Sequence, residues 1–181
     1  MCNFTILQRA LKQIPNFFDV TYSLPYPKNE EYSTRIPSRV DTLILHHSGS
    51  QTWTVQDVAN YHVKEKGWPG IGYHLVIDKD GHIFQTNKLS SQSYHCKNHN
   101  FRSIGICCLG NFELEEMKEK QEHALMMLIW TIGYHFKPLN IYGHLDLGNT
   151  LCPGLHFPLI ESKIHYNNAL VKQSESMHLP S

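Results

Sequence analysis

The sequence predicts a single α/β domain with a central mixed β-sheet flanked by helices. Short apolar runs rich in β-forming residues alternate along the chain with longer stretches of helical periodicity, an order typical of this class. Two of the predicted strands flank the tight turn "DKDG", which favours a hairpin within the sheet. The chain has 181 residues, enough for one domain with a substantial core but not for two.

The first 35 residues are predicted as a helix followed by an extended arm. Within residues 1–20, apolar side chains recur at helical spacing as far as Ile14, and Pro15 ends the run. Residues 21–38 contain three prolines among polar residues. We therefore expect an arm that wraps around the domain rather than a separate folded unit.

The main domain is expected over residues 36–168, followed by a polar tail over residues 169–181. Its predicted strands are residues 42–46, 72–78, 82–86, 103–110 and 140–144. Its predicted helices are residues 54–67, 114–136 and 156–170, and the first begins with Thr54 as N-cap. The last dozen residues are polar, and we expect them to fray.

The charge balance argues against two classes of partner. Basic and acidic residues number 16 each, so the formal net charge is zero and the pI is about 7.2. We therefore expect neither a nucleic-acid partner nor an electrostatic membrane anchor. The apolar runs are too short for membrane insertion, and the N-terminus lacks the pattern of a signal peptide. We expect synthesis in the cytoplasm, with the protein either kept there or released from it by another route.

Cysteine and histidine usage favours a reducing compartment and leaves room for a metal site. There are five cysteines, an odd number, and Cys107 and Cys108 are adjacent, where a mutual disulfide would be strained. Histidine is unusually frequent, with 13 residues. His47 and His74 are expected to face away from the site because each follows a candidate site residue along a strand.

Three residues at strand ends or in loops are candidate metal ligands: His46, His144 and Cys152. His46 ends a predicted strand, and the other two lie in the turn-rich stretch "YGHLDLGNTLCPG". Two imidazoles and one thiolate leave a fourth tetrahedral position open, which is the pattern of a catalytic rather than a structural zinc site. The spacing of His144 and Cys152 alone is weak evidence for a metal site and favours loop residues that share no purpose.

Four blocks in order resemble one known family. They are "LILHHSGS", "GIGYHLVIDKDGHI", "SYHCKNHNFRSIGICCLG" and "GHLDLGNTLCPG", and together they span roughly residues 35–164. In this order they resemble the zinc-dependent N-acetylmuramoyl-L-alanine amidases, the superfamily of bacteriophage lysozyme-type amidases and animal peptidoglycan recognition proteins. The resemblance implies the fold of this superfamily and one Zn²⁺ per chain, with His46, His144 and Cys152 as its ligands.

The resemblance also implies roles for several other residues. Tyr73 falls on a tyrosine that lies near the metal-bound water. Thr150 falls where many members have a catalytic Lys and others a Thr, whose hydroxyl can donate a hydrogen bond to an oxyanion. His95 and Asn100 fall on a motif that contacts the muropeptide. Trp68 either lines the substrate groove, which we favour, or caps a loop.

The function implied by this resemblance is cleavage of the amide bond between N-acetylmuramic acid and L-alanine in peptidoglycan. We expect a monomeric phage or prophage endolysin or another cell-wall lytic enzyme, with peptidoglycan as its partner, released to the cell wall by lysis or a holin-like route. The general base is left open between His95 and the metal-bound hydroxide. The alternatives are a recognition module that binds without cutting, a stem-peptide peptidase and a structural zinc site. A cytosolic recycling amidase is a further alternative, although Cys107 stands where those enzymes have Glu.

Overall fold

The computed structural model describes residues 3–27 and 30–177. Within these residues, six strands form one mixed sheet in the order β1-β4-β3-β5-β2-β6. The strands are β1 (Phe17–Asp19), β2 (Thr42–His47), β3 (Leu75–Ile77), β4 (Ile83–Gln85), β5 (Ser103–Cys108) and β6 (Asn140–Gly143). Only the β3–β4 pair is antiparallel among these described strands, as the hairpin prediction required. The predicted fold class is confirmed.

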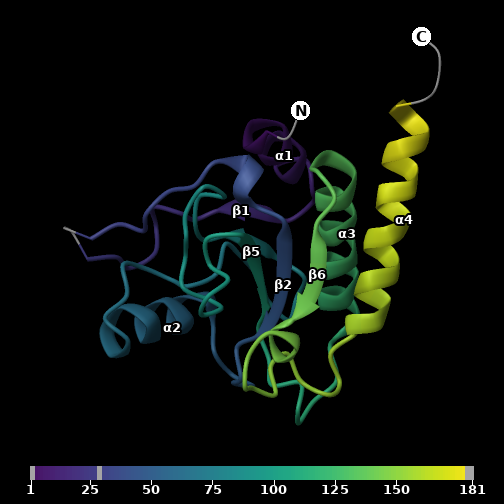
Figure 1. Cartoon of the computed structure of the whole chain (residues 1–181). Helices are drawn as coiled ribbons and strands as arrows, with labels where there is room; N and C mark the ends of the chain where they lie inside the picture. The colour runs from purple at the N-terminus through teal and green to yellow at the C-terminus, as the bar shows by residue number, and fades with distance from the viewer. Residues whose placement is uncertain (1–2, 28–29, 178–181) are drawn as a thin grey trace.

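Helices cover both faces of this sheet (Figure 1). They are α1 (Phe4–Leu11), α2 (Val55–Asn60), α3 (Glu119–His135) and α4 (Leu159–Met177). On one face, Leu75, Ile77 and Ile106 join the large core beneath α1 and α3. On the other face, Val76 and Cys107 join a smaller core with α2. This alternation along β3 and β5 is what burial of both faces of a parallel sheet demands.

The N-terminal region differs from its prediction. The helix within residues 1–20 was expected to continue as far as Ile14, but α1 ends at Leu11, and the unpredicted segment Phe17–Asp19 pairs with β4 as an edge strand. Pro15 cannot continue a helix, and Asn16 takes a positive φ of 58° that redirects the chain. The carbonyl of Asn16 then accepts a hydrogen bond from the Ile83 amide at 2.9 Å. Residues 1 and 2 of that prediction lie outside the described residues.

Helix boundaries also differ further along the chain. The helix predicted from residue 114 begins at Glu119, because the amides of Leu114 and Glu115 are instead bonded in a turn to the Asn111 carbonyl. The helix predicted over residues 54–67 has the expected Thr54 capping box, but α2 gives way to a π-helical turn at Tyr61–Glu65.

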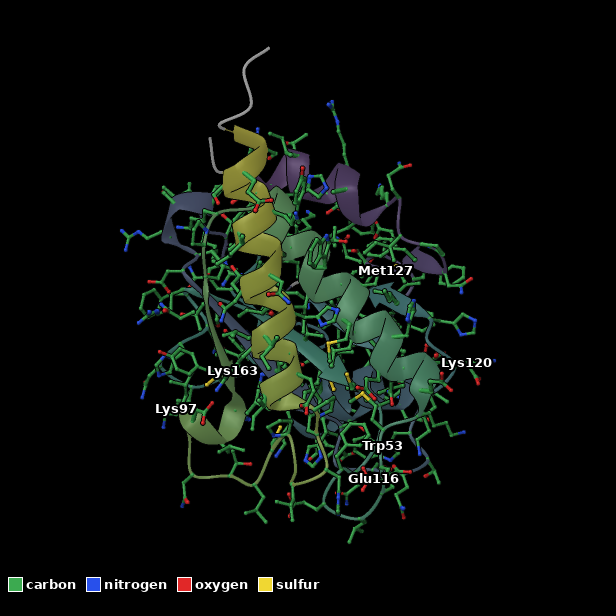
Figure 2. All side chains as sticks on the ribbon, turned by 90° about the vertical axis from the view of Figure 1, so that its right-hand side faces the viewer. Trp53, Lys97, Glu116, Lys120, Met127 and Lys163 are labelled. Carbon is green, nitrogen blue, oxygen red and sulfur yellow. The ribbon has the colours of Figure 1, made fainter. Side chains whose placement is uncertain are left out.

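The last helix is longer than predicted, because α4 continues to Met177 through much of the expected tail. Ala169 is fully buried against α3, where Gly133 leaves room for it. Gln173 donates to the carbonyls of Tyr134 and Phe136, both at 2.6 Å. Figure 2, viewed from the side of α4, shows α3 and α4 packed side by side on the outside of the sheet. Residues 178–181 of the predicted tail lie outside the described part.

The arm joins the domain through its backbone and side chains. Thr34 forms an isolated antiparallel bridge with Ser91, and the buried hydroxyl of Tyr32 donates to the Gly70 carbonyl at 2.8 Å. These contacts fit an arm that wraps around the domain. Among the described residues, no helix has both the length and the apolar character needed to cross a bilayer.

Candidate metal centre

The three candidate ligands meet where parallel strands end. His46 lies near the carboxyl end of β2, and His144 directly follows β6. Leu45 and Gly143 are register partners across these two strands, so the next residue on each begins the same edge of the sheet. The Cys152 loop returns to this edge, because the Leu145 amide donates to the Cys152 carbonyl at 2.6 Å. The topology therefore brings together ligands separated by about a hundred residues.

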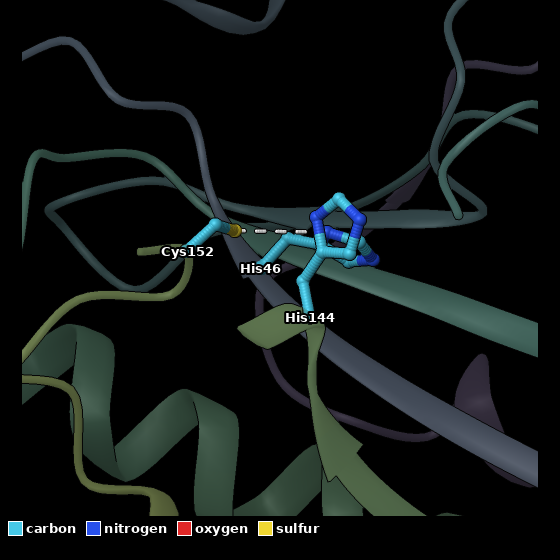
Figure 3. A group of neighbouring side chains, drawn as sticks. All are labelled: His46, His144 and Cys152. Atoms are coloured by element: carbon cyan, nitrogen blue, oxygen red, sulfur yellow. Dashed lines mark hydrogen bonds between the residues drawn. The ribbon is translucent and has the colours of Figure 1, made fainter. Parts of the chain in front are cut away.

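The side chains of His46, His144 and Cys152 point toward one another (Figure 3). Their ligand atoms all lie within 4.8 Å of one another, and the Cys152 Sγ is 3.7 Å from the His46 Nδ1. Ligand atoms of a tetrahedral zinc ion, bound at about 2.0 Å for nitrogen and 2.3 Å for sulfur, lie about 3.3–3.6 Å apart. The donor set and the spacing therefore fit zinc after a small contraction.

Burial of the site disfavours the charged forms of its side chains, unless a bound cation balances the negative charge of a thiolate. It lowers the pKa of His46 well below its usual value, with the neighbouring histidines adding to the effect. Burial also raises the pKa of the Cys152 thiol to about 12, against the opposing effect of the His47 amide that donates to its sulfur. Neutral imidazole is the ligand form of histidine, whereas cysteine must lose a proton to bind a metal.

The loop that bears His144 is held by polar contacts of its own. The Asp146 carboxylate accepts from the Gly143 amide at 2.9 Å and lies 3.5 Å from the Lys163 ammonium of α4. Lys163 lies beside this turn in Figure 2. The Thr150 Oγ1 accepts from the Cys152 amide at 3.1 Å, and the Thr150 side chain is half-buried. The hydroxyl oxygen of Thr150 thus steadies the backbone of Cys152.

Tyr73 lies beside His46, with the two ring centroids 5.2 Å apart. Burial raises the pKa of its phenol well above the usual value, and the nearby thiols of Cys107 and Cys152 raise it further. The phenol therefore keeps its proton at neutral pH, and its hydroxyl is hydrogen-bonded to the Cys107 side chain.

An aromatic wall, made of Tyr73, His62 and Trp68, extends from the candidate metal centre. The His62 ring stacks on Trp68 at 4.6 Å and lies 5.5 Å from the Tyr73 ring. Tyr94, which the sequence analysis missed, meets Trp68 edge-on at 5.8 Å and is 42% exposed. Its place directly before His95 in the third motif is the signal that could have identified it.

His95 and Asn100 lie behind His46. The His95 ring contacts the His46 Nε2 through its Nδ1 at 3.0 Å and the Ser103 hydroxyl through its Nε2 at 3.1 Å. Both ring nitrogens are engaged and the residue is 7% exposed, which argues against its predicted roles as substrate contact and as base. The Asn100 side-chain oxygen accepts from the amides of His95 and Cys96, so it shapes the loop. Substrate contact by Asn100 stays a prediction.

Of the neighbouring histidines, His47 faces away from the cluster, as expected from strand alternation, and its ring lies beside Phe112. His74 instead lies just before β3 and packs edge-on against His95 at 5.5 Å. The His47 Nδ1 accepts from the Phe112 amide at 3.2 Å. His74 is fully buried, where the Gly105 amide donates to its Nδ1 and its Nε2 contacts the Ser91 carbonyl. The Arg35 guanidinium lies 2.9 Å from the same ring, a contact that nothing in the arm sequence signalled.

Comparison with known proteins agrees with this geometry. Residues 36–155 match the family described as N-acetylmuramoyl-L-alanine amidase. The chain is 32% identical over 124 residues to peptidoglycan-recognition protein SC1a of Drosophila melanogaster, covering 62% of this chain and 67% of the relative. It is 26% identical over 121 residues to the endolysin of Escherichia phage T7, covering 62% and 80%.

A solved structure is similar over most of the chain. The endolysine N-acetylmuramoyl-L-alanine amidase LysCS from Clostridium intestinale URNW superposes with a TM-score of 0.70 at 29% sequence identity. The superposition covers 86% of this chain and 97% of that one. The family match over residues 36–155 includes all three candidate ligands.

Proposed function

Because the chain belongs to the N-acetylmuramoyl-L-alanine amidase family, we propose that it is a zinc-dependent hydrolase of bacterial peptidoglycan. The bond cleaved is the amide between the lactyl group of N-acetylmuramic acid and the L-alanine of the stem peptide. The observation that supports this proposal best is the convergence of His46, His144 and Cys152 at one sheet edge. A recognition module that only binds peptidoglycan has no need of such a donor set.

Zinc would be held by the His46 Nδ1, a His144 ring nitrogen and the Cys152 thiolate. A bound zinc ion supplies a Lewis acid that polarises the scissile carbonyl and lowers the pKa of water. The sulfur of Cys152 accepts a hydrogen bond from the His47 amide at 3.3 Å, and this contact stabilises its anionic form.

Tyr73 and Thr150 are the proposed donors to the reacting carbonyl. The protonated phenol of Tyr73 donates a hydrogen bond to the oxygen on which negative charge develops. The Thr150 oxygen accepts from the Cys152 amide, so its proton is left to donate in the same way. A Thr brings no positive charge to this position, in contrast to the Lys of many family members.

The cellular role that we propose is that of an endolysin, made in the cytoplasm and released to the cell wall by lysis. Endolysins are among the similar proteins in both sequence and structure. Cys107 on β5 is buried and uncharged. The recycling amidases have a carboxylate at this position, so Cys107 argues against a recycling role. We propose that peptidoglycan is the partner and that the protein acts as a monomer.

The test is metal dependence with identification of the new chain ends. Protein stripped with a chelator should not cleave purified peptidoglycan, and stoichiometric Zn²⁺ should restore cleavage, with L-alanine as the newly exposed amino terminus. Full cleavage by the stripped protein would refute zinc catalysis. A different new amino terminus would refute the proposed bond.

A further inference from the structure

A chain of hydrogen bonds lies behind the proposed metal ligand His46. It runs from the His46 Nε2 to the His95 Nδ1 at 3.0 Å, and from the His95 Nε2 to the Ser103 Oγ at 3.1 Å. It ends where the Ser103 hydroxyl donates to the backbone carbonyl of His99 at 2.8 Å. All three side chains are buried, so water does not compete for these contacts.

The last bond sets the direction of the others. A carbonyl oxygen can only accept, so the single proton of the Ser103 hydroxyl points to His99. The Ser103 oxygen must then accept from His95, which places the His95 proton on Nε2. The His95 Nδ1 keeps its lone pair and accepts from the His46 Nε2–H. This leaves the His46 Nδ1 without a proton, and that atom is the one 3.7 Å from the Cys152 sulfur.

We propose that His95 and Ser103 are positioning residues that hold His46 in the tautomer with Nδ1 free, so that the site is ready before a metal arrives. The inference rests on the proposed zinc site. The opposite arrangement, with a proton on the His95 Nδ1, would require the His46 Nε2 as acceptor. The His46 proton would then lie on Nδ1 and block the metal position.

Two further features of the fold hold the residues of this hydrogen-bond series in place. Ser103 and Gly105 lie on the same face of β5 because residues two apart on a strand point the same way. A Cβ at Gly105 would lie 2.6 Å from the His95 ring, so only glycine leaves room for that ring. The Asn100 side chain fixes the backbone of His95 from the other side at 3.0 Å.

The experiment compares Ser103→Ala with Ser93→Ala. Ser93 is a matched control because its buried hydroxyl also contacts a histidine ring, that of His74, at 3.2 Å, but away from the ligands. Nitrogen-15 spectra of the imidazoles in zinc-free protein should show the His46 proton on Nε2 in the wild type and in Ser93→Ala. Ser103→Ala should show a mixture of tautomers, and Ser103→Thr, which keeps the hydroxyl, should restore the wild-type spectrum.

Zinc affinity gives the second readout. Competition with a chromogenic chelator should show binding weakened about 10-fold or more in Ser103→Ala and unchanged in Ser93→Ala. A His46 proton on Nδ1 in the wild type would overturn the inference, as would wild-type spectra and affinity in Ser103→Ala. A wild type that binds no zinc would refute the proposed function, whereas the spectra of zinc-free protein decide the tautomer independently.

Discussion

Acid should destabilise the folded protein through His62, whose side chain supports the aromatic wall. Its ring is 7% exposed, its Nδ1 accepts from the Gly72 amide at 3.0 Å, and it stacks on Trp68. Burial, followed by the nearby charge of Lys66, lowers the pKa of His62 to about 4 from its ordinary value of 6.5. Protonation would replace the Nδ1 acceptor with a donor facing the Gly72 N–H.

The size and sign of the effect follow from that difference in pKa. The unfolded chain takes up a proton near pH 6.5, whereas the folded protein resists it until about pH 4. The His62 contribution is therefore complete above pH 6.5 and is lost as the pH falls toward 4. The full difference corresponds to about 3 kcal/mol of unfolding free energy, and most of it is lost by about pH 4.5.

Urea unfolding of the wild type and of His62→Asn at pH 7 and pH 4.5 tests this reasoning. The Asn side chain can still accept from the Gly72 amide but cannot be protonated. The other buried histidines, His46, His74 and His95, also have lowered pKa values, but they are common to both proteins. The free energy of unfolding should fall by about 2–3 kcal/mol more in the wild type than in the variant. Equal decreases would refute the assignment to His62.

Three further predictions concern the site and the helix packing. Cys152→Ser should fold but lose zinc and turnover together, because a neutral hydroxyl is a far poorer ligand than a thiolate; metal analysis beside an activity assay checks this, and an active variant would mean that the third ligand is misassigned. Tyr73→Phe should bind zinc normally yet turn over about 100-fold more slowly, and wild-type rates would remove Tyr73 from the mechanism. Gly133→Ala would place its Cβ 2.9 Å from that of Ala169 and should cost about 1–3 kcal/mol in thermal unfolding, with zinc binding retained; an unchanged melting temperature would show that α3 and α4 can move apart freely.

The sequence predicted the strands that support the candidate site because their signals are local. The apolar runs around Leu43 and Ile104 form central strands buried on both faces, so the run itself specifies the strand. Strand alternation likewise predicted that His47 faces away from the three candidate ligands. The resemblance to the amidase family was confirmed by the family match over residues 36–155.

The remaining features depend on contacts between distant segments. The short edge strand at Phe17–Asp19 exists because β4 offers a parallel partner more than sixty residues later. The polar end of α4 is helical because Gln173 reaches carbonyls at the end of α3. His95 was assigned to the substrate because nothing local shows that its ring lies between His46 and Ser103.

The most direct test of the central claim is mass spectrometry of purified peptidoglycan digested by the zinc-loaded protein, with Cys152→Ser as the control. The account predicts free stem peptides that begin with L-alanine and glycan strands that keep intact lactyl groups, both absent from the control. Intact muropeptides in both samples, with the protein sedimenting with the wall, would contradict it and identify a binding module instead.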